Sequence, residues 1–203
     1  MAYGVPIDDD FLRTLPEYKN KTTLTAKDRS TVALQQKFVY RDQAIKRLDE
    51  LKSDFGDGVS TLCLVYNATG DTITCHDTQS WKGHFYKQSP ENSFENGQWS
   101  IFMHVKPSVL PEGCTGAVIY RTKQHADVFL GWQNPWAPGS DTSCWAECRA
   151  WDHWWGTGSK SFMEHLLYDK AHSTHEDSSN GYKANISIGD STTSYCEAAI
   201  SLL

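Results

Sequence analysis

The chain has 203 residues, of which 39% are hydrophobic and 12% aromatic, which is typical of one folded domain. Its formal net charge of −6 argues against a nucleic-acid partner, because proteins that bind phosphate backbones carry clustered positive charge. No stretch approaches the roughly 18 consecutive apolar residues of a membrane-spanning helix, so we expect no transmembrane segment.

The first ten residues, MAYGVPIDDD, have neither the basic nor the apolar region of a secretory signal. This predicts a cytoplasmic protein. The six cysteines are then expected to remain reduced thiols rather than to form three disulfides. In that compartment the sequons at Asn67 and Asn185 would not be glycosylated.

Residues 1–24 show little periodicity, and the first regular element is expected to begin after Thr25. Thr25 is a suitable helix N-cap, with Asp28 as its capping-box partner. From residue 26 to 54 the pattern is helical, with a break expected near residues 40–42 and a C-terminal stop at Gly56. Its apolar residues lie near one stripe, which predicts that the helical segment packs on the rest of the chain; they are Leu34, Phe38, Ile45, Leu48 and Phe55.

After residue 58 the pattern changes to short β-branched and aromatic runs separated by turn residues. The expected strands are 59–66, 72–77, 99–106, 116–121, 127–132, 144–151, 183–188 and 195–203. The turn at residues 67–71 predicts a hairpin between the first two strands, and residues 161–168 predict one short helix. We therefore expect a mainly β fold, an antiparallel β-sandwich over residues 59–203, with residues 1–58 forming an N-terminal extension and helix packed on it.

Tryptophan is concentrated between residues 132 and 155. The rings of Trp136, Trp154 and Trp155 fall in segments rich in proline and glycine, which are expected to be loops. One interpretation is that these rings fill the core between two sheets. The other is that they form a site, because loop aromatics make platforms for sugars and cages for quaternary ammonium groups such as choline. The sequence leaves both open.

The motifs of common enzyme and metal sites are missing from the sequence. It contains no HExxH, zinc-finger, GxSxG or P-loop pattern. His165, His172 and His175 are close in sequence, but without a ligand spacing they are interpreted as solvated or hydrogen-bonded side chains. We expect no catalytic residues, no metal and no cofactor.

Several longer motifs resemble the 23 kDa jasmonate-induced proteins of plants. They are the stretches LVYNATGDTI (64–73), WKGH (81–84), NGQW (96–99), FMHVK (102–106), AVIYR (117–121) and WQNPW (132–136), with LTAKDR (24–29) upstream. The resemblance implies a stress-responsive protein inside the cell, with a role in plant defence and without a transferable catalytic motif.

A more distant resemblance concerns the fold. The strand and turn order, followed by a loop rich in proline and tryptophan, is similar to actinoporins and related fungal lectins, β-sandwiches that hold phosphocholine with aromatic side chains. It implies a site near Tyr120 and residues 134–136. The highly charged N-terminal helix departs from that pattern and puts pore formation in doubt.

Three hypotheses for function follow. The first is a non-enzymatic module that binds a lipid headgroup or a glycan through Tyr120, Trp136, Trp154 and Trp155. The second is a stress protein that uses the same aromatic residues to bind a protein partner. The third is a small-molecule enzyme built on the same pocket.

Overall fold

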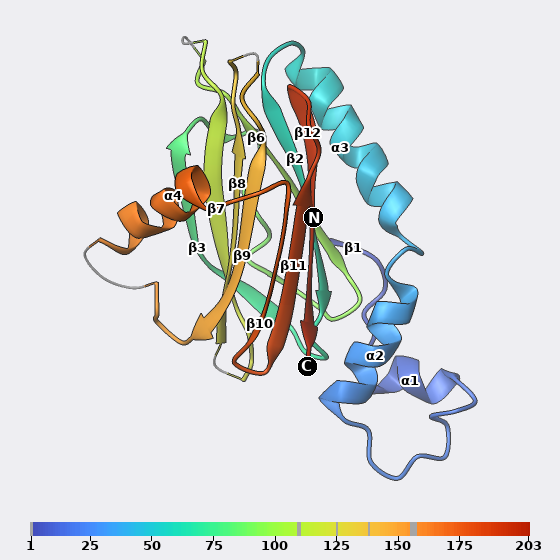
Figure 1. The fold of residues 1–203 in the computed structure, drawn as a ribbon. Helices are drawn as coiled ribbons and strands as arrows, with labels where there is room; N and C mark the ends of the chain where they lie inside the picture. Colours follow the sequence, from blue (N-terminus) through green and yellow to red (C-terminus); the bar gives the residue numbers. More distant parts are fainter. Residues whose placement is uncertain (1, 109–110, 125, 138, 155–157) are drawn as a thin grey trace.

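The computed structural model describes residues 2–108, 111–124, 126–137, 139–154 and 158–203 of the chain. The strands are β1 (Ala2–Tyr3), β2 (Ser60–Ala68), β3 (Ile73–Lys82), β4 (His84–Phe85), β5 (Ser93–Phe94), β6 (Trp99–Val105), β7 (Cys114–Arg121), β8 (Ala126–Asn134), β9 (Ser143–Ala150), β10 (Thr174–Ser179), β11 (Tyr182–Ile188) and β12 (Thr193–Leu202). The helices are α1 (Asp9–Thr14), α2 (Ala26–Gln36), α3 (Arg41–Phe55) and α4 (Ser159–Asp169). Two sheets face each other, with α2 and α3 against one and α4 against the other (Figure 1). The expected mainly β sandwich with an N-terminal helical segment is confirmed.

One sheet has the order β1-β6-β2-β12-β11-β10, with β4 also paired to β6, and the other has the order β5-β3-β7-β8-β9. Among the described strands, β2 and β12 form the one parallel pair. The expected hairpin between residues 59–66 and 72–77 is wrong, because β2 and β3 lie in different sheets. Asn67 is buried, and its amide donates to the backbone oxygens of Asp71 and Phe94 at 2.8 and 3.1 Å. These bonds hold a turn that crosses between the sheets.

The N-terminal helices begin and end largely as expected. The hydroxyl of Thr25 accepts from the backbone N–H of Asp28, and the Asp28 carboxylate accepts from the N–H of Thr25. The expected break is present but lies at residues 37–40, slightly before the expected residues 40–42, and α3 ends at Phe55 with Gly56 as its C-cap. The segment 1–24 is more regular than expected, since it contains α1 and since β1 pairs with β6.

The single apolar stripe expected over both helices is only partly buried. Leu48 on α3 is fully buried against the sheet, in a cluster with Leu62 and Ile101. Leu34 and Phe38, by contrast, are 46% and 68% exposed. Residues 37–40 interrupt the helical periodicity, so positions spaced as on one continuous helix do not all fall on the same face of α2 and α3. The expected stripe therefore cannot face the sheet along its whole length.

A polar strand closes the sandwich on one side. The segment 173–180 reads as a polar run, yet it contains β10, which lies beside the edge of β9. The ring of His175 lies 2.9 Å from the backbone oxygen of Ala146, and Asp177 accepts from the N–H of Cys148 at 2.7 Å. Polar side chains of β10 therefore form hydrogen bonds with backbone groups at the edge of β9, which explains why β10 is polar.

The helix α4 packs on the outer face of the β5-β3-β7-β8-β9 sheet (Figure 1). Its Met163 and Leu166 join Ala117, Ile119 and Phe129 in a small apolar cluster, separate from the core between the sheets. This packing brings the C-terminal end of α4 to the end of the sheet where β3 and β8 finish and β7 begins. None of the described helices combines the length and apolar character needed to cross a bilayer.

Candidate ligand-binding groove

Trp136 lies on a loop that leaves the end of β8, and the backbone before it is held from two sides. The buried amide of Asn134 donates to the backbone oxygen of Ser60 in the opposite sheet at 3.2 Å. On the other side the chain at Gly113 approaches so closely that a Cβ there would lie 2.1 Å from the Asn134 backbone oxygen. Only glycine fits at such a distance. The loop can therefore present the Trp136 indole at the surface, where it is 50% exposed.

A groove of about 210 Å³ opens beside Trp136. Its second ring belongs to Tyr168 on α4, whose hydroxyl lies 3.4 Å from that of Thr115 at the start of β7. The ammonium of Lys82, the last residue of β3, lies 5.2 Å from the centre of the Tyr168 ring. Glu112 adds a carboxylate from the loop before β7. Two aromatic rings, one cation and one anion thus line a single groove.

The positive charge of Lys82 is stabilised by this environment. Its polar contact with the Tyr168 phenol raises the pKa of Lys82 above the usual value, and partial burial opposes this shift without cancelling it. The negative charges of Glu112 and Glu164 act in the same direction as Tyr168. Lys82 is therefore positively charged at neutral pH, beside an aromatic ring and within reach of anything that enters the groove.

Tyr168 also borders a second, polar hollow of about 630 Å³. The lining is rich in hydroxyl, amide and carboxylate groups; the side chains that supply them are Gln133, Ser140, Asp141, Thr142, Ser143, Ser173 and Asp190. Such groups suit a ligand with several hydroxyls.

Three of the four residues expected to bind a ligand are described by the structure, and it separates them. Trp136 lines the groove, but Tyr120 is 0% exposed and packs against Phe94 in the core between the sheets, with ring centres 5.4 Å apart. Burial raises the pKa of Tyr120. Tyr120 therefore reaches no surface at which it could touch a ligand, contrary to the expectation from sequence, because its position on β7 faces the opposite sheet.

Trp154 also packs as a core residue. It is 6% exposed, and its ring centre lies 5.3 Å from that of Phe129. The Trp154 ring packs on Phe129 in the middle of β8, beneath α4, whereas Trp136 lies on the loop beyond the end of β8. They cannot contribute to one site. Trp155 lies outside the described residues.

Sequence reasoning missed the other groups of the groove. Lys82, Glu112 and Tyr168 come from a strand end, a loop and a helix that are far apart in the chain. The only local signals were the WKGH motif that contains Lys82 and the short helix expected over residues 161–168. Neither indicates that these side chains meet beside Trp136.

Comparison with known proteins places the chain in a family. The pattern of the Nakanori-like protein family matches residues 3–203. The chain belongs to the Nakanori-like family. It is also 32% identical to the 23 kDa jasmonate-induced protein of Hordeum vulgare, over 95% of this chain and 93% of that protein. The resemblance to jasmonate-induced proteins is therefore confirmed.

Solved structures agree with this placement. The crystal structure of the lipid-binding protein Nakanori superimposes with a TM-score of 0.95 at 44% identity, covering 99% of this chain and 100% of that one. A lectin from Xerocomus chrysenteron superimposes with a TM-score of 0.50 at 8% identity, covering 71% of this chain and 100% of that one, and shows the shared fold alone. Nakanori is named as a lipid-binding protein and the Hordeum vulgare protein as a jasmonate-induced one, which supports a binding role for this member of the Nakanori-like family.

One serine and histidine of this Nakanori-like chain lie within hydrogen-bond distance, as in many hydrolases. Ser80 Oγ is 2.9 Å from His104 Nε2, while the indole N–H of Trp132 donates to His104 Nδ1 at 3.2 Å. Because an indole can only donate, Nδ1 must be unprotonated, and the proton of the neutral ring is on Nε2. His104 then donates to Ser80 and cannot accept its proton. This pair is therefore not a nucleophile and base.

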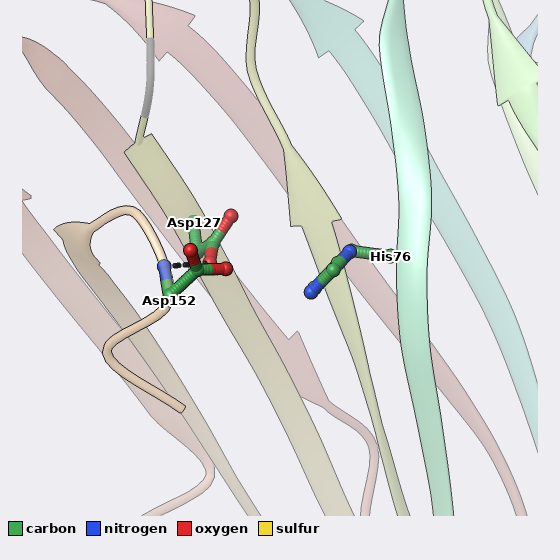
Figure 2. A group of neighbouring side chains, drawn as sticks. All are labelled: His76, Asp127 and Asp152. Atoms are coloured by element: carbon green, nitrogen blue, oxygen red, sulfur yellow. Dashed lines mark hydrogen bonds between the residues drawn. The ribbon is translucent and has the colours of Figure 1, made fainter. Parts of the chain in front are cut away.

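A second polar cluster lies at the end of the sheet opposite Trp136. Figure 2 shows His76 on β3, Asp127 on β8 and Asp152 after β9, with ligand atoms within 4.8 Å of one another. Arg121 donates to both oxygens of Asp127, each at 2.8 Å, and to Asp152 at 2.6 Å. Its guanidinium also lies 4.4 Å from the ring centre of Trp151. Arg121 supplies the positive charge between these carboxylates, and a metal ion there would have to displace it.

Proposed function

We propose that this Nakanori-like chain is a non-enzymatic protein that binds the polar headgroup of a lipid in the groove between Trp136 and Tyr168. The observation that carries the proposal is the exposed pair of rings beside a cation and a carboxylate, on a loop whose backbone is held from both sides. The 44% identity with a lipid-binding protein over nearly the whole chain supports it.

The chemistry of the groove suits a zwitterionic headgroup such as phosphocholine. A quaternary ammonium group is attracted to the faces of Trp136 and Tyr168, and the carboxylate of Glu112 adds to this attraction. The phosphate of the same headgroup would accept from Lys82. A volume of about 210 Å³ suits a headgroup better than a drug-sized molecule, whose pockets start at about 300 Å³.

Vesicle flotation tests the proposal. Wild-type protein should float with phosphatidylcholine vesicles and bind less to phosphatidylglycerol vesicles, which lack choline. Trp136→Ala should weaken the binding by several-fold to about thirtyfold, because a cation–π contact is worth about 0.5–2 kcal/mol. Phe38→Ala is the matched control, since Phe38 is 68% exposed but lies at the α2–α3 junction.

Two results would contradict the proposal. If the wild-type chain binds neither vesicle, the groove is not a lipid site. If Phe38→Ala and Trp136→Ala reduce flotation equally, binding is a general effect of exposed apolar rings rather than a property of this groove.

A glycan is the second candidate ligand, and the polar hollow next to Tyr168 favours it. A sugar could stack on the ring while its hydroxyls bond to the lining side chains. A glycan array would show this as binding to one group of related sugars. Such binding should fall on Asp141→Asn, which leaves Trp136 in place.

A further inference from the structure

One of the two rings that a choline group would use, that of Tyr168, already has a cation over it in the free protein. The ammonium of Lys82 lies 5.2 Å from the centre of the Tyr168 ring, and its polar contact with the phenol raises the pKa of Lys82. Among the described residues, Lys82 makes no ion pair with a carboxylate within 4.0 Å. The ring is therefore the principal partner of Lys82 in the described structure.

This arrangement distinguishes between two kinds of ligand. A free quaternary ammonium ion that uses the Tyr168 ring must displace Lys82 from it and then remain beside the positive charge of Lys82. A ligand that also carries a phosphate gives the displaced ammonium a new partner, because Lys82 can donate to the phosphate oxygens. The ligand with a phosphate compensates Lys82 for the lost contact with the Tyr168 ring, and the ammonium ion alone does not.

We propose that Lys82 is the specificity-determining residue of the groove: it covers the Tyr168 ring in the free protein and selects headgroups that pair a phosphate with a quaternary ammonium over ammonium ions alone. The inference rests on the proposed function. It goes further in naming the residue that discriminates and the direction of the discrimination.

The position of Lys82 suits this role. It is the last residue of β3, and Gly83 follows with a φ of 90°, where a Cβ would lie 2.0 Å from the backbone oxygen of Val105. The chain is thus fixed directly after Lys82, while the lysine side chain itself is exposed and has rotatable bonds. The ammonium can exchange the ring for a phosphate without a change in the backbone.

Competition on phosphatidylcholine vesicles tests the inference. Bound protein is displaced with soluble phosphocholine or with choline chloride at equal ionic strength, in wild type, Lys82→Met and Lys82→Arg. For the wild type, phosphocholine should compete at a concentration at least tenfold lower than choline. Lys82→Met should weaken phosphocholine about tenfold and leave choline equal or stronger, and Lys82→Arg should keep most of the wild-type preference.

The controls separate this inference from the function it rests on. Lys160→Met removes the same charge from the opposite end of α4 and should change neither competition curve. Lys82→Gln is a second neutral variant, and melting curves of each variant establish that the fold is intact. If Trp136→Ala weakens vesicle binding but Lys82→Met leaves the ratio of the two competitors unchanged, the role of Lys82 is refuted and the lipid site stands. If wild-type protein does not bind the vesicles, both proposals are refuted.

Discussion

Replacing Trp154 by alanine should destabilise the fold, because this ring is 6% exposed and packs against Phe129 at 5.3 Å. A buried tryptophan removes about 200 Å² from water, worth about 5 kcal/mol at roughly 25 cal/mol per Å². The Trp154 indole N–H has no hydrogen-bond partner among the described residues, and removing that donor returns about 1–2 kcal/mol. The expected net loss is therefore about 3–4 kcal/mol.

The same change at Trp136 should cost less than about 1 kcal/mol, because half of this side chain is exposed. Urea unfolding and thermal melting, both followed by circular dichroism, measure the two values. For a domain of this length about 3–4 kcal/mol corresponds to a decrease of about 6–16 °C in melting temperature.

Trp154→Phe is the matched control. It keeps most of the buried ring and removes the unpaired N–H, so its loss should be about half that of Trp154→Ala or smaller. Equal stabilities of Trp154→Ala and Trp136→Ala would refute the distinction between a core ring and a ligand-binding ring.

Three further predictions concern acid, a close backbone contact and the thiols. Burial lowers the pKa of His104 from 6.5 to about 3, so the folded protein favours the neutral ring. The folded state therefore keeps its full stability above about pH 6.5 and loses stability as the pH falls towards 3, because the unfolded chain then binds a proton that the folded chain does not. Between pH 7 and 4.5 this group alone should remove about 2–3 kcal/mol from the free energy of unfolding, and His104→Gln should lack that part of the pH dependence in urea unfolding; the same pH dependence in wild type and variant would disprove it. Gly113→Ala should lower both the melting temperature and vesicle binding, whereas Gly189→Ala, where the nearest atom to a new Cβ is 3.9 Å away, should change neither. All six cysteines should react with a thiol reagent after denaturation without reductant, since all are free thiols in the structure; three disulfides would contradict the cytoplasmic location that we propose.

Local signals in the sequence were sufficient where neighbours along the chain decide the structure. The capping box of Thr25 and Asp28 and the stop at Gly56 depend on residues within one helical turn, and both are found as expected. Most strand ranges also agree within a few residues, because β-branched and aromatic runs between turn residues have few other stable conformations. The family could be recognised because its motifs are long and continuous.

The tertiary structure alone decided which side chains face a partner and which face solvent. Turn residues 67–71 suit a hairpin and a sheet crossing equally, and only the pairing of β2 with β6 and β12 distinguishes them. Tyr120 is covered by the opposite sheet and Trp154 by α4, whereas Trp136 projects beyond the end of the sheet. The groove unites four segments that are distant in the chain, and α4 brings Tyr168 to it only because its apolar face packs on the sheet. Contacts between such distant segments depend on which apolar faces are buried against each other, and residue type and spacing along the chain do not show this.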